Sequence, residues 1–151
     1  MRISAKADYA VRAAVELAAS VDEPIKGERL ADSQGIPLQF LEHILLELKH
    51  ARLVRARRGA RGGYWLAKPP EEITLATIIR AVEGPLANIQ DQAPEATKYP
   101  GNAKDLTDVW IAVRASLRRV LEEVTIADLR DGTIPDDVMA MTRDEGAWVT
   151  R

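Results

Sequence analysis

Apolar residues recur at intervals of three and four over the first third of the chain, which is the spacing of one face of an α-helix. The pattern predicts a helix from Ser4 to Ser20, with the Ser4 hydroxyl as its N-cap. A shorter helix is predicted from Glu28 to Gln34, where Gly35 can end it in the left-handed conformation. Pro37 suits the first turn of a third helix, which is expected to run to about Ala51. The apolar face of that helix comprises Phe40, Leu41, Ile44, Leu45 and Leu48.

The period then changes to two. Residues 53–57 (LVRAR) alternate apolar and basic side chains, residues 58–63 (RGARGG) supply a flexible turn, and residues 64–67 (YWLA) can return as a second strand. These features predict a β-hairpin with arginines at its tip. A short helix, a glycine turn, a longer helix and such a hairpin form the outline of a winged helix-turn-helix. The predicted fold class is therefore mainly α with a small β-hairpin wing, and residues 1–84 are predicted to form a winged helix-turn-helix domain.

The pattern continues with a fourth helix and then breaks. The helix is expected from Thr74 to Val82, before Gly84 and Pro85 interrupt it. Residues 85–101 have little apolar content and no clear period, so they are interpreted as a loop. Long loops in compact domains are usually functional or disordered.

A heptad seam follows in residues 102–124, where apolar side chains alternate spacings of four and three. Its members are Leu106, Trp110, Val113, Leu117, Val120 and Val124. Such a seam is typical of a helix that packs on a partner helix. Dimerisation is favoured because the earlier elements already account for a core, and the alternative is a core helix of the same subunit. Residues 102–130 are therefore predicted as a dimerisation helix and a short following helix, and residues 131–151 as a partly mobile tail.

The amino-acid composition excludes several kinds of functional site. The chain has 151 residues and no cysteine, which excludes disulfides, thiolate catalysis, cysteine-ligated zinc and all-cysteine iron–sulfur clusters. The amino-terminal MRISAKADYA lacks the apolar core of a signal peptide, and no apolar run approaches the length of about 18 residues that a membrane span needs. A single domain in the cytoplasm, without membrane contact, is therefore expected.

The formal net charge of −2 conceals a division along the chain. Residues 1–70 contain 12 Lys and Arg against 8 Asp and Glu, whereas residues 71–151 contain 9 against 15. Residues 49–68 have no acid and carry seven cations: Lys49, Arg52, Arg55, Arg57, Arg58, Arg61 and Lys68. Such a run favours a polyanionic partner, and the alternative is a solvated basic face. Placed on a winged helix-turn-helix, it indicates binding to double-stranded DNA.

Four segments carry a resemblance to a known family: MRISAKADYAVRA, QGIPLQFLEHILLELKHARLVRARRG, RGGYWLAKPPEEITLATIIRAVEGPL and LTDVWIAVRASLRRVLEEVTIADL. Together they resemble the Rrf-two family of bacterial winged helix-turn-helix regulators, which contains IscR, NsrR and CymR, over about residues 1–130. The resemblance implies a homodimeric DNA-binding repressor or dual regulator. It places recognition helices in successive major grooves and wings in the flanking minor grooves of a palindromic operator.

The resemblance also implies which residues contact DNA. Positions that face bases in such regulators fall here on Pro37, Gln39, Glu42 and His43, and the wing arginine matches Arg58. Pro37 lacks the hydroxyl that the family commonly has at that point. The wing reads RGARGGY where the family typically has RGPGGGY, so this tip gains a charge and loses a stiffening proline.

The chemistry of these side chains fits that assignment. Gln39 can pair with adenine and Glu42 can accept a hydrogen bond from cytosine, although Glu42 and His43 have the alternative of a solvent-facing helix surface. Arg58 or Arg61 can enter a narrow, negative minor groove. The remaining cations, Lys49, Arg52, Arg55, Arg57 and Lys68, suit phosphates.

No metal, cofactor or enzyme activity is predicted. Cluster-binding members of the family carry three cysteines in the loop that corresponds to residues 85–101, and this loop has none. Asp8 matches an acidic ligand position of some relatives, but it is interpreted as a surface or capping acid. His43 and His50 are two helical turns apart, roughly 10 Å, which is too far for one metal. No catalytic motif stands out.

Two hypotheses follow. The first is a dimeric transcription regulator that is constitutive or responds at the loop and dimer region to an unidentified small molecule or protein. The second is a winged-helix module that binds a protein and not DNA.

Overall fold

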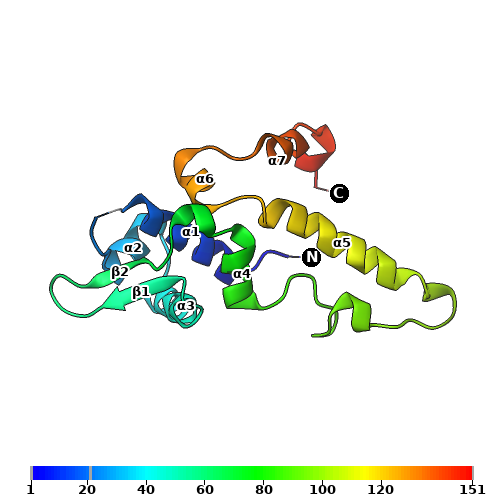
Figure 1. Cartoon of the computed structure of the whole chain (residues 1–151), viewed down its shortest axis with the longest axis horizontal. Helices are drawn as coiled ribbons and strands as arrows, with labels where there is room; N and C mark the ends of the chain where they lie inside the picture. The colour runs from blue at the N-terminus through cyan, green and yellow to red at the C-terminus, as the bar shows by residue number, and fades with distance from the viewer. Residues whose placement is uncertain (1, 21, 151) are drawn as a thin grey trace.

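The computed structural model describes residues 2–20 and 22–150, and Figure 1 shows a winged domain from which one helical arm projects. The first helices are α1 (Ala5–Ala19), α2 (Gly27–Gln34) and α3 (Leu38–His50). Strands β1 (Val54–Arg57) and β2 (Gly63–Leu66) form the antiparallel hairpin. After a 3₁₀ turn at Pro70–Glu72 comes α4 (Leu75–Glu83). The predicted fold class, mainly α with a β-hairpin wing, is confirmed.

The core of the winged domain lies where α1 packs against α3, α4 and a later helix, α6 (Ile126–Asp131). Ala10, Ala13 and Ala14 of α1 are fully buried, and their small side chains let the neighbouring helices approach closely. The large side chains that fill the core are Leu30, Leu41, Ile44, Leu45, Leu48, Ile73, Ile78 and Ile126.

Phe40 departs from the predicted apolar face of α3. The other four members of that face are buried, but the Phe40 side chain is 37% exposed. Its ring meets the Tyr9 ring edge-on, with centroids 5.6 Å apart. Phe40 therefore lies at the rim of the core, since its position on the helix points past α1. Pro37 is the N-cap of α3, one residue before the first turn.

Arg12 of α1 holds the turn between α2 and α3. Its Nε donates to the Gln34 side-chain oxygen at 3.0 Å, and a second nitrogen donates to the Gln34 carbonyl. Gln34 in turn donates to Glu16 at 2.6 Å. Gly35 then adopts φ 61° and ends α2, as predicted. These bonds orient α3 relative to α1 before any partner is present.

The arm is α5 (Leu106–Leu121), which is shorter than the continuous helix predicted for residues 102–124. A 3₁₀ turn at Gly101–Ala103 precedes it, and a second at Pro94–Ala96 packs against it. Val124 lies beyond its end, is 3% exposed, and accepts a hydrogen bond from the Leu75 amide at 3.0 Å. The expected seam is therefore wrong at Val124, because this side chain belongs to the winged domain's own core.

After the arm, the chain returns to the winged domain. Ile126 of α6 is fully buried, and its amide donates to the Ile73 carbonyl at 2.8 Å. The tail that follows contains α7 (Asp136–Met141) and a 3₁₀ turn at Glu145–Trp148. The last residue of the predicted mobile tail, Arg151, lies outside the described residues. Within the described residues, no helix is both long and apolar enough to cross a membrane.

A capping box at Thr125 and Asp128 stabilises the start of α6. The Asp128 carboxylate accepts the Thr125 amide at 2.8 Å and the Thr125 hydroxyl at 2.7 Å, while the Asp128 amide donates back to that hydroxyl. The Thr125 hydrogen bonds hold the pKa of Asp128 below its ordinary value. We expect Asp128→Ala to lower the free energy of unfolding by about 1 kcal/mol, as loss of a cap usually does.

The pH dependence of that loss checks its origin. Because the folded-state pKa is depressed, the carboxylate stabilises the protein above the unfolded-state value of about 4 and ceases to do so as pH falls through the folded-state value. Thermal unfolding of wild type and Asp128→Ala should therefore differ at pH 7 and converge in acid. Asp105→Ala is the matched control, because Asp105 precedes α5 without making a capping hydrogen bond. An equal effect of both substitutions at pH 7 would contradict the capping role.

Candidate nucleic-acid interface

One face of α3 is free of contacts with the core. Its exposed residues recur at helical spacing: Gln39, Glu42, His43, Leu46, Lys49 and His50. Pro37 is exposed at the start of the same helix. The opposite face, with Leu41, Ile44, Leu45 and Leu48, is buried. Since α3 is 13 residues long and bare along one side, it has the form of a helix that can enter a major groove.

The wing is built on two glycines that the sequence places at its tip. A Cβ on Gly62 would lie 2.0 Å from the Arg57 carbonyl oxygen, and a Cβ on Gly63 would lie 2.6 Å from that of Ile25. Gly63 also has φ 147°, in the region that favours glycine. The Gly62 amide donates to the Gly59 carbonyl at 2.9 Å, which closes a tight turn. The hairpin tip, expected to be flexible, is therefore held in one shape by backbone packing.

The wing is also tied to the helices. Tyr64 of β2 exchanges two backbone hydrogen bonds with Ile25, at 2.8 and 2.9 Å, and Lys26 donates through its ammonium to the Gly59 carbonyl. The link before α2 thus acts as a short third strand. The orientation of the hairpin relative to α3 follows from these bonds.

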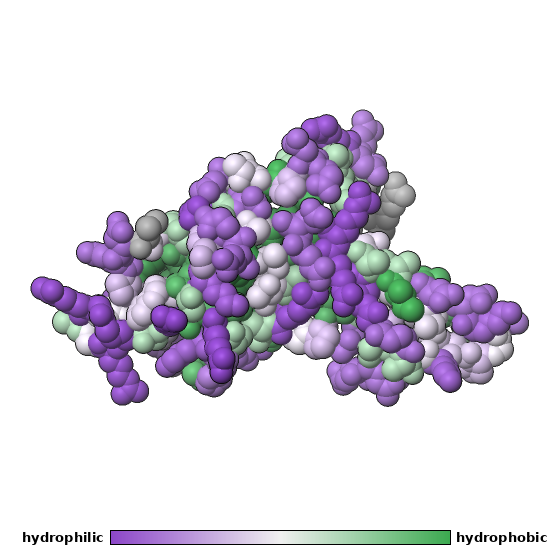
Figure 2. All heavy atoms as spheres, in the orientation of Figure 1, coloured by the Kyte–Doolittle hydropathy of each residue, from purple (hydrophilic) through white to green (hydrophobic). Residues whose placement is uncertain are grey.

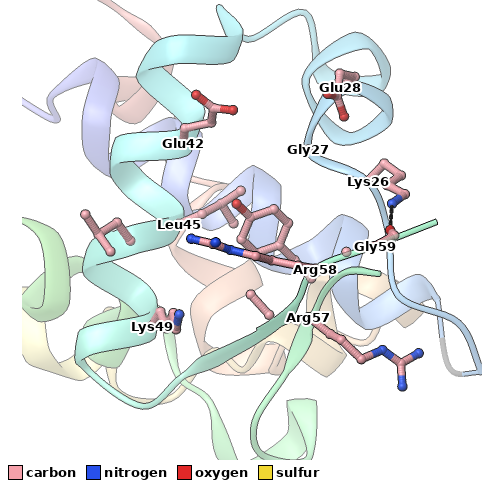
Figure 3. Close-up of a pocket in the computed structure, with 13 residues that line it drawn as sticks. Lys26, Gly27, Glu28, Glu42, Leu45, Lys49, Arg57, Arg58 and Gly59 are labelled. Atoms are coloured by element: carbon pink, nitrogen blue, oxygen red, sulfur yellow. Dashed lines mark hydrogen bonds between the residues drawn. The ribbon is translucent and has the colours of Figure 1, made fainter. Parts of the chain in front are cut away.

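A hollow of ≈ 500 Å³ lies between the start of α2, the exposed face of α3 and the wing (Figure 3). The Arg58 side chain reaches from the wing across this hollow toward α3, whereas Arg57 points away from it (Figure 3). Glu42 and Lys49 line the hollow from α3. The structure therefore brings the predicted wing arginine and the predicted recognition helix to one surface.

A second group of predicted phosphate-binding side chains surrounds the groove between the end of α3 and the hairpin. This cationic groove is lined by Lys49, Arg52, Arg55 and Lys68, together with the apolar surface of Trp65. Its volume is ≈ 510 Å³, and no acidic residue is among its lining. Four cations with no acid among them suit a phosphate backbone.

Arg57 and Arg61 lie on the other side of the wing. Arg57 donates to the Arg61 carbonyl at 3.0 Å, and both line a hollow that also contains Asp22 and Glu23. Figure 2 shows hydrophilic side chains extending outward at this end of the molecule. The seven cations of residues 49–68 therefore do not form one surface, because Arg57 and Arg61 line a different hollow from Lys49, Arg52, Arg55 and Lys68.

Comparison with known proteins identifies the family that this geometry serves. A family model named Rrf2 and described as "Iron-dependent Transcriptional regulator" matches residues 3–132. The chain belongs to the Rrf2 family. The predicted family resemblance is thereby confirmed.

Relatives of this Rrf2 chain agree with it in sequence and in structure. A Mycobacterium tuberculosis protein, provisionally named an HTH-type transcriptional regulator, is 50% identical over 145 residues, which span 95% of this chain and 90% of that protein. The solved structure of CymR, the global cysteine regulator of Bacillus subtilis, matches with a TM-score of 0.71 and 31% identity over 88% of this chain and 98% of CymR. A solved structure of T. potens IscR matches with a TM-score of 0.69 and 29% identity over 100% of this chain and 93% of IscR.

These comparisons decide the broad function. The Rrf2 protein is a winged helix-turn-helix transcriptional regulator that binds DNA, and the prediction that it is not an enzyme is confirmed by the family of its relatives.

The residues do not fit the iron chemistry in the family's description. The Rrf2 chain has no cysteine, and thiolates are the usual ligands of iron–sulfur clusters. Within residues 2–20 and 22–150, no three His, Asp or Glu side chains gather as a metal site would require. Asp8, the residue that matches an acidic ligand of some relatives, forms an ion pair with Arg12 at 3.1 Å. It is therefore a surface acid.

Three residues of this surface were missed by reasoning from sequence. Leu46 is 45% exposed in the middle of the bare face of α3, and Lys26 and Glu28 line the hollow from the start of α2. A helical projection of α3 would have found Leu46, because it falls between Glu42 and Lys49 on the same face. Lys26 and Glu28 carried no signal, since the packing of α2 against α3 brings them to this surface.

Proposed function

We propose that this Rrf2 protein is a cytoplasmic homodimeric repressor that reads a palindromic operator through α3 and the wing, without an iron–sulfur cluster. The observation that carries the proposal is the shared hollow, where Arg58 faces the exposed side of α3. Gln39, Glu42, His43 and Leu46 are the candidate base contacts, and Pro37 lies at the helix end that would enter the groove first. Leu46 offers an apolar surface suited to a thymine methyl group.

The cations divide between two kinds of contact. Arg58 and Arg61 are the candidates for a minor groove, and Lys49, Arg52, Arg55, Arg57 and Lys68 are the candidates for phosphates. Lys49 borders both the hollow and the cationic groove. Since a duplex would span both surfaces, phosphates beside the major groove would meet this groove while bases meet the hollow.

Homodimerisation is supported by the state of α5. This helix has 16 residues and none of them is buried, whereas most helical stability in proteins comes from packing an apolar face. Leu106, Trp110, Val113, Leu117 and Val120 form a half-buried stripe along it, and Val109 beside the stripe is 51% exposed. Figure 2 shows apolar side chains uncovered on this arm. A second copy of α5 would cover them.

The test is selection of bound sequences from a random double-stranded DNA pool by the full chain. A two-fold symmetric motif is expected, with half-sites separated by one helical turn, about 34–36 Å, or a multiple of it. Affinity should fall steeply with salt, because phosphate neutralisation releases counterions. Recovery of no motif, together with a stoichiometric protein partner in pull-down, would instead support the protein-binding module.

Substitutions on the two elements should separate their roles. Arg58→Ala is expected to weaken binding to all sequences alike and to reduce the salt slope by about 1, whereas Gln39→Ala should relax one base position by about 1–3 kcal/mol. Competition gel shifts against single-base operator variants measure both effects. Arg143→Ala is the control, since it removes the same charge from the exposed tail. The same loss pattern for Arg58→Ala and Gln39→Ala would refute the division of roles.

A further inference from the structure

A third hollow of the molecule lies away from the DNA surface, between the end of α4, the following loop and α5. It has a volume of ≈ 430 Å³, and three arginines line it: Arg80, Arg114 and Arg118. Asn88 of the loop is its other polar side chain, and no acidic residue is among its lining. We call this hollow the arginine pocket. Its size falls in the range of about 300–1,000 Å³ that small-molecule sites occupy.

The arginine pocket concentrates positive charge in the acidic half of the chain. Residues 71–151 contain nine Lys and Arg against fifteen Asp and Glu, yet three of those nine line this one hollow. On an acidic, solvent-exposed surface, nothing about solvation would favour three arginines lining the same hollow. The gathering indicates that a negative group belongs there.

Two glutamates beside the arginine pocket form ion pairs with these arginines. Glu95 of the loop pairs with Arg114 at 2.7 Å, and Glu122 pairs with Arg80 and lies 3.8 Å from Arg118. Two carboxylates thus face three guanidinium groups, which leaves one positive charge in excess. The Arg80 hydrogen bond holds the pKa of Glu122 below its ordinary value.

The exposure of the Arg114 pair shows which partner can leave. The Arg114 side chain is 16% exposed, whereas that of Glu95 is 58% exposed. Glu95 can therefore turn into water at little cost, while Arg114 would remain in place and keep its need for an anion. A ligand carboxylate or phosphate can take the place of Glu95 on the guanidinium, whose planar fork suits bidentate contacts with such groups.

Trp110 of α5 carries a buried donor that has no partner. It precedes Arg114 by four residues, as Arg114 precedes Arg118, so the three side chains follow one another along the helix. The buried Trp110 Nε1 has no hydrogen-bond acceptor. Buried donors are nearly always paired in folded proteins, so an acceptor is missing at Trp110, which lies one helical turn before Arg114 and outside the lining of the arginine pocket.

From these observations we propose that the arginine pocket is an effector site for a small molecule that carries a carboxylate or phosphate group. The ligand replaces Glu95 on Arg114 and Glu122 on Arg80 and Arg118. Both ion pairs join α5 to the rest of the chain, one through the loop and one through α4. Since α4 also packs against α3, their exchange alters how the arm meets the DNA-binding face.

The regulatory part of this inference rests on the proposed function, because it needs a DNA-binding dimer. The ligand and the DNA must then change each other's affinity by the same factor. Binding of the anion to the pocket does not require DNA and can be tested in its absence.

The test measures thermal unfolding and calorimetric binding of the full chain with inorganic phosphate, sulfate and succinate, against sodium chloride of equal ionic strength. At least one anion is expected to raise the melting temperature, and the rise should grow with the logarithm of the anion concentration. Phosphate or sulfate alone would indicate a phosphate-type ligand, and succinate alone a carboxylate. No stabilisation beyond chloride by any of the three would overturn the proposal.

Matched variants locate the binding. Arg118→Gln should abolish the stabilisation, whereas Arg119→Gln, which removes the same charge from the neighbouring exposed position of α5, should retain it. Glu95→Gln should strengthen anion binding several-fold, because it removes the competing carboxylate from Arg114; a purely structural ion pair would not give tighter binding. Equal responses of Arg118→Gln and Arg119→Gln would overturn the pocket.

Separate measurement of DNA binding distinguishes the two proposals. If the protein binds its selected DNA and no anion binds, the effector site fails and the proposed function stands. If anions bind the pocket but no DNA is bound, the pocket stands and the regulatory role fails with the proposed function.

Discussion

Val113→Asp is expected to convert the proposed homodimer to a monomer and to lower affinity for its selected DNA by at least about 100-fold, the gain that linking two binding modules typically provides. Val113 lies on the half-buried stripe of α5, where a second copy would cover it. In a two-fold symmetric interface each substitution occurs twice. Two carboxylates would therefore enter an apolar contact without partners, which costs several kcal/mol.

A control on the same helix isolates the interface. Ala115 is exposed two residues later, on the opposite side of α5, and Ala115→Asp introduces the same side chain with the same low helix propensity. Light scattering during gel filtration should report a monomer for Val113→Asp and a dimer for Ala115→Asp, and gel shifts should follow the same order. A dimer in both variants would show that α5 does not form the interface.

Gly62→Ala is expected to open the wing and destabilise the protein by about 2–4 kcal/mol, in the upper range for single substitutions. The added Cβ would stand 2.0 Å from the Arg57 carbonyl oxygen and 2.7 Å from the Arg58 carbonyl carbon. Both neighbours are backbone atoms, so no side-chain rotation relieves the overlap. The turn must move, and Arg58 and Arg61 move with it.

Gly59→Ala is the matched control in the same turn. Gly59 has φ 103° but nothing within 4 Å of an added Cβ, so the substitution brings only backbone strain of about 1–2 kcal/mol. Thermal unfolding compares the two losses, and hydrogen exchange of the β1 and β2 amides reports whether the hairpin opens. DNA affinity should fall at least tenfold more for Gly62→Ala than for Gly59→Ala. Intact exchange protection in Gly62→Ala would contradict the role assigned to this glycine.

The helices of the winged domain could be predicted because their signals are local. Ser4, Gly35 and Thr74 act at helix ends within a few residues of the chain, and the spacing of buried side chains in α1 and α3 follows from helical geometry. Phe40 shows the limit of that reasoning. Periodicity marks an apolar face, but it does not say how far the neighbouring helix extends over it.

The candidate site could be predicted in its members and not in its arrangement. Gln39, Glu42 and His43 share a helix, so their common face was implied by spacing alone. Successive side chains of a strand alternate in direction, so Arg57 and Arg58 point to opposite sides. Which of the two faces α3 depends on how the hairpin is placed by its contact with Ile25, and no spacing encodes that. Lys26 comes near the wing through a hydrogen bond between segments 33 residues apart.

By itself, the sequence determined the order of the elements, the winged helix-turn-helix outline, the basic character of the wing and the lack of thiolate ligands, since each depends on residue type and short-range spacing. The tertiary structure decided that α5 ends at Leu121, before the heptad pattern does, and that Val124 is buried within its own chain. It also decided which cations meet in one hollow and which arginines of the acidic half gather in another. These outcomes depend on contacts between segments far apart in the chain, and no periodicity encodes where such segments meet.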